Sequence, residues 1–158
     1  MKSVYIETTI PSFYHETRPT DPAKTWRAVT RKWWDEKRFN YALYSSRWVL
    51  AELVLAPRGK AHKCRNLLRT VSILENPRNF RSIVDYYIEH RLMPGEASND
   101  AAHLAIASAY KMDFLLTWNC KHLANAHKME HIGVLNKRLG LHTPIITTPL
   151  GLMESAEK

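Results

Sequence analysis

The chain has 158 residues, of which 45% are hydrophobic and 24% are charged, and this composition suits one folded domain with a sizeable core. No apolar run is long enough to span a bilayer, and no repeat or Gly/Ser-rich linker divides the sequence. We therefore expect a single soluble, cytoplasmic domain over residues 1–158. The two cysteines, Cys64 and Cys120, form no CxxC pair, which argues against a zinc knuckle or redox site and predicts buried free thiols.

Positive charge is concentrated in the first half of the sequence. The formal net charge is +8; residues 1–79 contain 15 Lys or Arg and 7 Asp or Glu, whereas residues 80–158 contain 8 of each. Between Glu52 and Glu75 no acid interrupts a basic run made of Arg58, Lys60, Lys63, Arg65 and Arg69. Such asymmetry is typical of a surface that faces a polyanion, whereas a solvated helix face explains any single one of these residues equally well.

The first elements read as a strand followed by two helical segments. Lys2–Glu7 contains three consecutive β-formers and ends at an acid, which predicts a short buried strand. A turn or short helix follows through Tyr14, and Asp21-Pro22 is expected to cap and open a longer helix. The spacing of 3 to 4 residues on that helix predicts a core face, part of which could serve a partner, made of Trp26, Val29, Trp33 and Trp34.

A second strand is predicted at Tyr41–Tyr44, and Ser45 or Ser46 is expected to cap a third helix that runs to Ala56. This helix, SRWVLAELVLAP, is almost entirely apolar, so we expect it to be buried on most sides. Glu52 is its only acid. A buried carboxylate is costly unless it is paired or ligates a cation, which makes Glu52 a candidate site residue; a solvent-facing Glu52 is the alternative.

The remaining elements continue the alternation. Ser98 or Asn99 is expected to cap an alanine-rich helix that begins near Asp100, whose small side chains permit close approach to a sheet. The other predicted segments are a basic helix at Gly59–Leu68, a segment of open type at Val71–Leu74, a helix at Pro77–Arg91, a strand at Asp113–Thr117, a helix at Ala124–Leu139 and a strand at Ile145–Thr147.

Strands that alternate with helices predict an α/β fold with a central parallel sheet covered on both faces. Ligands of such sheets bind beyond the carboxyl ends of the strands, near the switch in strand order. Glu7 and Asn119 fall at two such ends, and Glu52 and Asp100 come from helices that could lean over the same edge. Oxygen ligands of this kind suit Mg2+ or Mn2+, although Asp100 could also be only a capping acid of its helix.

Four segments in this order, YIETTI, WVLAEL, NDAAHLAIASA and FLLTWNCKHL, resemble the signature blocks of the PIN-domain family, most closely its VapC-type toxin members. The resemblance runs from Lys2 to about Thr148. It implies a three-layer α/β/α fold and a Mg2+- or Mn2+-dependent endoribonuclease that leaves a 5′-phosphate and a 3′-hydroxyl. It also implies an antitoxin protein partner of a type II toxin-antitoxin pair, and a homodimer.

Position by position, the resemblance places Glu7, Glu52, Asp100 and Asn119 at the first to fourth catalytic positions. It makes the three carboxylates the metal ligands, and Thr8 matches a hydroxyl residue that commonly follows the first acid. Two positions depart from the usual pattern, because the first and fourth are more often Asp. Glu7 adds a methylene and Asn119 removes a charge, which predicts weaker metal affinity or the use of a single ion.

Two alternatives compete with the nuclease interpretation. The spacing of His127, Glu130 and His131 matches the H-x-x-E-H pattern of inverted zinc peptidases, but only 27 residues follow for a further ligand, so we favour a solvated helix. The other alternative is a PIN fold with a weakened metal site that binds RNA or a protein without cutting. His103 and His122, beside the matched blocks, are expected to pack or to support the ligands.

Overall fold

Five short parallel strands form the centre of the computed structural model, which describes residues 1–153. Their order across the sheet is β3-β2-β1-β4-β5, so the chain fills one half from β1 outwards and then the other half. The strands are β1 (Ser3–Ile6), β2 (Ala42–Ser46), β3 (Ser72–Leu74), β4 (Phe114–Leu116) and β5 (Ile145–Thr147). The predicted α/β fold with a central parallel sheet is confirmed. The segment Val71–Leu74, for which the sequence predicts no type, contains strand β3.

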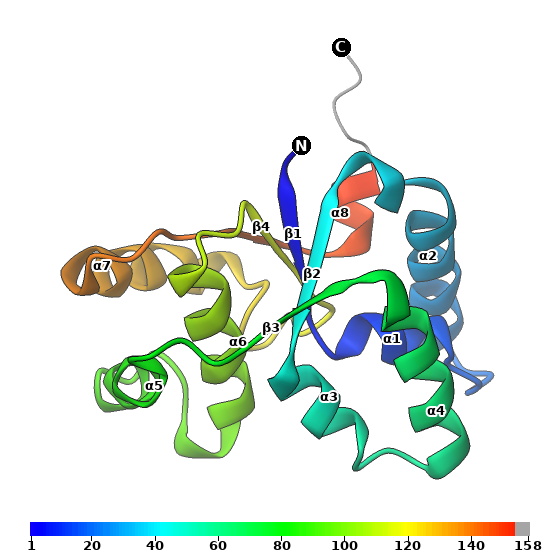
Figure 1. Ribbon diagram of the computed structural model, residues 1–158, viewed down its shortest axis with the longest axis horizontal. Coiled ribbons are helices and arrows are strands. Elements are labelled where there is room, and N and C mark those ends of the chain that lie inside the picture. Colours follow the sequence, from blue (N-terminus) through cyan, green and yellow to red (C-terminus); the bar gives the residue numbers. More distant parts are fainter. Residues whose placement is uncertain (154–158) are drawn as a thin grey trace.

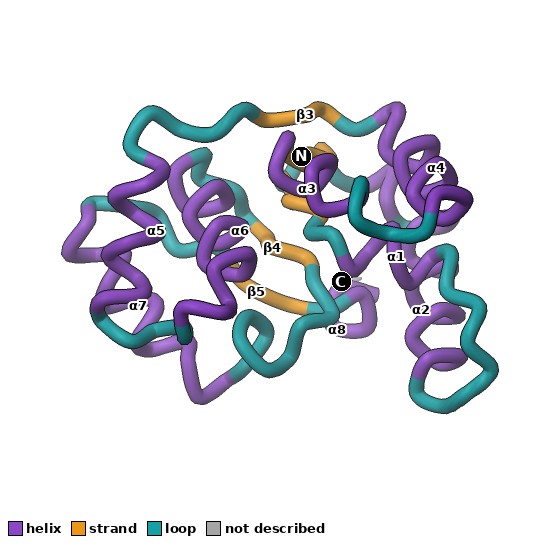
Figure 2. Tube along the Cα trace, turned by 90° about the horizontal axis from the view of Figure 1, so that it is seen from below, coloured by secondary structure: helices purple, strands orange, loops and turns teal. Residues whose placement is uncertain are grey.

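Helices cover both faces of this sheet (Figures 1 and 2). One face carries α1 (Thr9–Tyr14), α2 (Ala23–Glu36), α4 (Arg58–Leu67) and α8 (Pro149–Met153). The opposite face carries α5 (Phe80–Glu89), α6 (Ser98–Ala109) and α7 (Met129–Leu139). The remaining helix, α3 (Arg47–Leu53), directly follows β2 and therefore lies at the edge formed by the carboxyl ends of the strands. The result is three α/β/α layers.

Two elements, β1 and α6, are almost completely buried. Val4, Tyr5 and Ile6 of β1 have no exposed surface, and every residue of α6 between positions 101 and 108 is buried. The small alanines on α6 leave room for the sheet, as the sequence predicts. A strand that is buried on both faces reads as a continuous apolar run, which explains why β1 shows no alternation.

The tryptophan-rich stripe of α2 faces the interior. Trp33 and Trp34 are buried, and Trp26 stacks on Trp118 with a centroid distance of 4.7 Å and an interplanar angle of 8°. The Trp118 indole N–H also donates to the Thr30 hydroxyl at 2.7 Å. These contacts confirm a core face.

Helix starts follow the sequence prediction in one of three cases. Ser46 caps α3, because its hydroxyl accepts the backbone N–H of Val49 at 3.2 Å. The predicted cap at Asp21 is wrong, since Pro22 occupies the N-cap of α2 and no side chain caps this helix. The predicted caps of α6 are also wrong: Ala97 precedes the helix, and the Asn99 carbonyl instead accepts the Trp48 indole N–H at 3.0 Å. A tertiary contact has taken the polar side chain that local preference would use as a cap.

The third helix is shorter and more exposed than its sequence predicts. It ends at Leu53 instead of Ala56, because the next backbone N–H groups, of Leu55 and Ala56, donate to carbonyls three residues back (3.0 and 3.1 Å) and form tighter turns. The prediction that this helix is buried on most sides is wrong, since only Val49 and Leu53 are buried within it. Beyond its end, Leu55 is 85% exposed.

Smaller differences concern the thiols and the end of the described chain. Cys64 is buried as predicted, but Cys120 is exposed, because it follows Asn119 in the loop after β4. The short helix α8 had no sequence signal beyond Pro149. No helix within residues 1–153 is long and apolar enough to cross a membrane.

Candidate metal and nucleic-acid site

The switch in strand order lies between β1 and β4, and the candidate site lies at their carboxyl ends. The register pairs Ile6 with Leu116, so Glu7 and Thr117 leave the sheet side by side. The Glu7 backbone N–H extends this pairing by donating to the Leu116 carbonyl at 3.2 Å. This is the position at which open parallel sheets bind ligands.

Glu7 is a buried carboxylate without a Lys or Arg partner in residues 1–153. Its Oε1 accepts hydrogen bonds from the Thr9 backbone N–H at 3.0 Å, the Thr9 hydroxyl, and the Thr117 hydroxyl at 2.7 Å. Burial raises the pKa of Glu7, and nearby His103 and these hydrogen bonds offset the rise only in part. The fold therefore leaves its negative charge incompletely compensated, which is what a bound cation would correct.

Glu52 reaches the same edge from α3. Its Oε1 accepts hydrogen bonds from the Thr8 hydroxyl and from His103 Nε2, the latter at 2.6 Å. Burial raises the pKa of Glu52, but the contacts with His103 and Thr8 outweigh that effect and lower it overall. The side chain is 20% exposed, so the alternative of a fully solvent-facing Glu52 is wrong.

His103 is the only fully buried histidine in the described chain, and it lies among the carboxylates. Its Nε2 is also 4.0 Å from Glu7 Oε2. Burial lowers the pKa of His103, but the hydrogen bond to Glu52 and the charges of Glu7, Glu52 and Asp100 outweigh burial and raise it overall. His103 therefore lies beside the candidate acids and contacts them, as the sequence predicts.

Asp100 and Asn119 form the remaining corner of the site. The Asn119 amide donates to Asp100 Oδ1 at 2.7 Å, and the Asn119 carbonyl accepts the backbone N–H groups of Lys121 (3.1 Å) and His122 (3.0 Å). Those backbone donors fix which way the amide points. Burial raises the pKa of Asp100, and Glu52 adds to the rise against the opposing effects of His103, His122 and Asn119. Asn119 thus positions Asp100 and uses its own polar atoms within the protein.

The four predicted residues belong to one connected network. Thr117 joins its halves, since its hydroxyl donates to Glu7 and accepts the Asn119 backbone N–H at 3.0 Å. Sequence reasoning did not single out Thr117, Thr9 or Tyr5, although all three stand inside the matched blocks. A hydroxyl two residues from a candidate site residue was the available signal.

The carboxylate oxygens of this network are ligands of the kind that Mg2+ or Mn2+ prefers. Within residues 1–153, no protein group donates a hydrogen bond to Glu7 Oε2, Glu52 Oε2 or Asp100 Oδ2. The same residues contain no preassembled cluster of three or more His, Cys, Asp or Glu ligands. The two observations are compatible, because Mg2+ binds through one or two carboxylates and keeps several waters.

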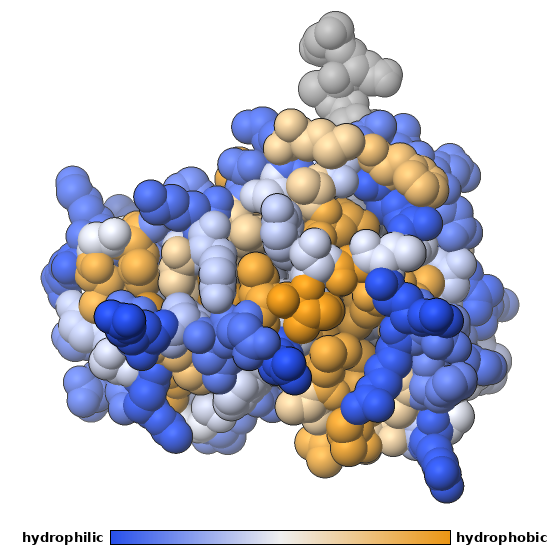
Figure 3. Space-filling model, in the orientation of Figure 1, coloured by the Kyte–Doolittle hydropathy of each residue, from blue (hydrophilic) through white to orange (hydrophobic). Residues whose placement is uncertain are grey.

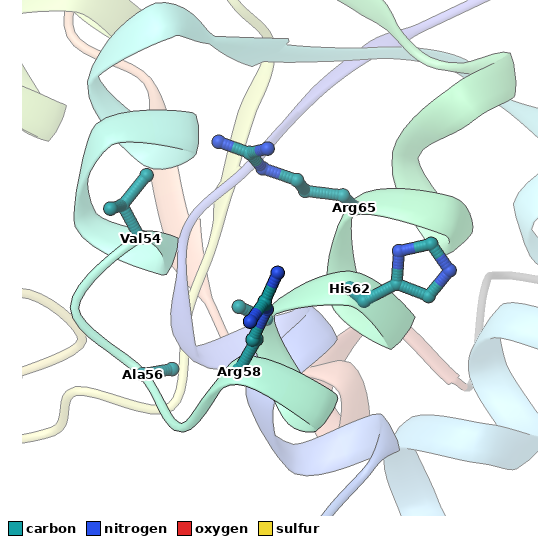
Figure 4. Close-up of a pocket in the computed structure, with 6 residues that line it drawn as sticks. Val54, Ala56, Arg58, His62 and Arg65 are labelled. Atoms are coloured by element: carbon teal, nitrogen blue, oxygen red, sulfur yellow. The ribbon is translucent and has the colours of Figure 1, made fainter.

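A basic cavity begins two residues after Glu52. It has a volume of about 330 Å³ and lies between the end of α3 and the outer side of α4, where Val54, Ala56, Arg58, Ala61, His62 and Arg65 line it. In Figure 4, the Arg58 and Arg65 side chains point into the space beside Val54, and the segment from β1 to α1 runs behind it. Hydrophobic side chains gather on the surface over α3, flanked by hydrophilic ones over α4 (Figure 3). Within residues 1–153, neither arginine has an acidic partner.

The competing zinc site receives no support from the geometry. His127 lies in a 3-10 turn that precedes α7, whereas His131 lies in the helix itself, and both are exposed. On the surface, Arg47 at the start of α3 pairs with Glu75 at 2.7 Å.

Comparison with known proteins gives a fold relationship. The sequence matches no protein-family model and no curated protein. A chain in the crystal structure of VapBC2 from Rickettsia felis bound to a DNA fragment from their promoter superposes with a TM-score of 0.58 at 15% sequence identity, over 92% of this chain and 98% of that one. At this identity the likeness establishes a shared fold: the protein has the three-layer α/β architecture of a chain from a VapBC2 complex.

Proposed function

We propose that this protein is an endoribonuclease that hydrolyses RNA phosphodiester bonds with Mg2+ or Mn2+. One observation carries the proposal: a single network of polar contacts at the β1/β4 edge links Glu7, Glu52 and Asp100, and each of them keeps a carboxylate oxygen to which no described protein group donates. The raised pKa values of Glu7 and Asp100 support it, because they mark charges that the protein alone does not stabilise.

The side chains divide the work. Glu7, Glu52 and Asp100 would hold the cation, which supplies charge next to the phosphate and lowers the pKa of a bound water. Thr9 and Thr117 fix Glu7 Oε1, and Asn119 fixes Asp100 Oδ1, so that each carboxylate presents its other oxygen. This orientation before substrate binding avoids reorganisation during the reaction.

The cavity at Arg58, His62 and Arg65 is suited to the RNA backbone. Phosphates of nucleic acids are held mainly by Lys and Arg. Its arginines have no acidic partner in the described chain, and the cavity adjoins the segment that carries Glu52. An RNA strand that crosses the carboxylate edge would place neighbouring phosphates here.

We further propose that the protein is the toxin of a type II toxin-antitoxin pair, neutralised by an antitoxin protein and assembled as a homodimer. The shared fold with a chain of the VapBC2 complex supports the antitoxin partner, whereas the homodimer rests on the resemblance of the sequence blocks alone. Induced expression in a bacterial host tests it: the wild-type protein should arrest growth and Asp100→Asn should not. Normal growth at matched expression levels of the wild type would contradict a toxin.

The decisive test of the nuclease is cleavage of a panel of fluorescent single-stranded RNAs in Mg2+, Mn2+ or EDTA. Asp100→Asn removes the charge with almost no change in volume, and Asp85→Asn on the exposed side of α5 makes the same change away from the site. We expect cutting by the wild type and by Asp85→Asn in either metal, and none by Asp100→Asn or in EDTA. Binding of RNA by the wild type without cutting in any metal would instead identify a non-catalytic binding module.

A further inference from the structure

The hydrogen bonds around Glu52 continue away from the candidate site into the core. His103 Nδ1 lies 2.8 Å from the Tyr5 hydroxyl, and that hydroxyl lies 2.7 Å from the Ser46 hydroxyl. Tyr5, His103 and Ser46 have no exposed surface. A buried polar group is costly unless it forms hydrogen bonds. Each member of this series of hydrogen bonds is therefore needed to satisfy its neighbours.

This series of hydrogen bonds begins and ends at the same helix, α3. Ser46 is the N-cap of α3, where its hydroxyl accepts the Val49 backbone N–H, and Glu52 lies near the other end of the same helix. The ring therefore runs from Ser46 through Tyr5 of β1 and His103 of α6 back to Glu52. It ties both ends of α3 to β1, which Glu7 directly follows, and to α6, which carries Asp100.

The ring can form with either arrangement of its protons. A carboxylate only accepts, so His103 Nε2–H donates to Glu52 Oε1. At the other ring nitrogen, the Tyr5 hydroxyl can donate to a neutral imidazole and accept from Ser46, or accept from an imidazolium and donate to Ser46. In both arrangements Ser46 still accepts the helix N–H. The ring therefore holds Glu52 in place whether His103 is neutral or protonated.

We propose that Tyr5 is a positioning residue of the metal site, acting through His103 to set Glu52 in place. This inference rests on the proposed metal-binding function. The ring holds Glu52 Oε1 and thereby directs the other oxygen of the carboxylate to the cation. Tyr5 itself makes no hydrogen bond to any of the three carboxylates within the described chain, so its effect on metal binding has to pass through the ring, by way of His103 or of the Ser46 cap of α3.

The chain offers a matched control for Tyr5→Phe. Tyr87 is also fully buried, and its hydroxyl also donates a short hydrogen bond, to Asn136 at 2.6 Å between α5 and α7. Tyr87→Phe therefore removes one buried hydroxyl away from the ring. By isothermal titration with Mn2+, we expect Tyr5→Phe to raise the dissociation constant about tenfold and Tyr87→Phe to leave it unchanged. Equal effects of the two variants would overturn the positioning role.

A second measurement tests the ring without metal or RNA. In EDTA, the fall in melting temperature caused by Tyr5→Phe should be clearly smaller in a Glu52→Gln background than in the wild type, because the two residues are coupled through His103. The effect of Tyr87→Phe should be the same in both backgrounds. Additive effects of Tyr5→Phe and Glu52→Gln would overturn the ring.

The two measurements separate failure of this inference from failure of the proposed function. A wild type that neither binds Mn2+ nor cuts RNA refutes the proposed function, and with it the metal-positioning role, even if the coupling in EDTA is found. A wild type that binds Mn2+ and cuts RNA, with Tyr5→Phe indistinguishable from Tyr87→Phe, refutes this inference alone.

Discussion

Two buried glutamates, Glu7 and Glu16, show how differently one fold can treat the same side chain. Glu16 accepts the guanidinium of Arg18 through both oxygens, at 2.9 Å from Nε and 2.8 Å from Nη2, together with the backbone N–H groups of Thr17 and Arg18. The hydrogen bonds from the Arg18 side chain are the main cause of its low pKa, which lies at about 2. The charge of Glu16 is therefore satisfied locally, by the two residues that follow it in the loop between α1 and α2.

Glu7 has almost the same exposed fraction as Glu16 but lies much deeper in the protein, receives only hydroxyl and backbone donors, on one oxygen, and has its pKa raised by burial. The difference teaches which acids to regard as structural. A carboxylate that is paired with an arginine of the same protein needs no ligand. A cluster of carboxylates without Lys or Arg partners in the described residues has negative charge that a cation from outside the protein can neutralise.

The largest expected effect follows from removing the charge of Glu7. Glu7→Gln should reduce RNA cleavage by at least about 100-fold, because a lost cation ligand costs several kcal/mol in the transition state. Its melting temperature in EDTA should stay level or rise. The raised pKa means that the folded protein disfavours the ionised form, so at neutral pH neutralisation stabilises the fold. Cleavage at the wild-type rate would contradict a role for Glu7 at the site.

Asn119→Asp should have the next largest effect. Its effect on stability should differ between the metal-free and the metal-bound protein. The carboxylate keeps the acceptor for the loop N–H groups but replaces the amide that donates to Asp100 with a second negative charge. We expect a loss of about 1–2 kcal/mol in the free energy of unfolding in EDTA, and a larger stabilisation by Mn2+ than in the wild type. Thermal unfolding with and without Mn2+ measures both. A variant as stable as the wild type in EDTA would argue that the amide does not hold Asp100.

The layout of the fold and the placement of the acids could be predicted from the sequence, because apolar runs and strand ends are local signals. Ile145–Thr147 was predicted with the bounds it has, and Glu7 and Asn119 fall at the strand ends where they were expected. The ring through Tyr5 could not be predicted. It joins residues 41 and 98 positions apart, and their meeting depends on the depth and rotation of α3 and α6. The exposure of Leu55 likewise depends on where α3 ends against the sheet.

Glu16→Gln is expected to show the reverse of the Glu7 result. Cleavage should be retained, while the free energy of unfolding falls by about 1–2 kcal/mol at neutral pH through the loss of charge-assisted hydrogen bonds. The folded pKa of about 2 lies below the ordinary value of 4.5, so the charge stabilises the fold above pH 4.5 and this contribution is lost as the pH falls towards 2. Acid titration of stability should therefore be flatter in the variant over that range. A fall in cleavage without a fall in stability would blur the distinction between the two glutamates.

The smallest expected effect concerns arginines, for which the same contrast holds between Arg18, paired with Glu16, and Arg65, which has no acidic partner in residues 1–153. In the uncleaving Asp100→Asn background, Arg65→Ala should weaken single-stranded RNA binding and make the slope of log affinity against log salt shallower by about 0.7, as expected for one lost phosphate contact. Arg138→Ala on the exposed side of α7 removes the same charge far from the cavity and should leave the slope unchanged. Fluorescence anisotropy over a range of salt concentrations measures both. Equal slopes for the two variants would mean that RNA binding depends only on the net charge of the protein. The cavity beside Glu52 would then not be a phosphate-binding site.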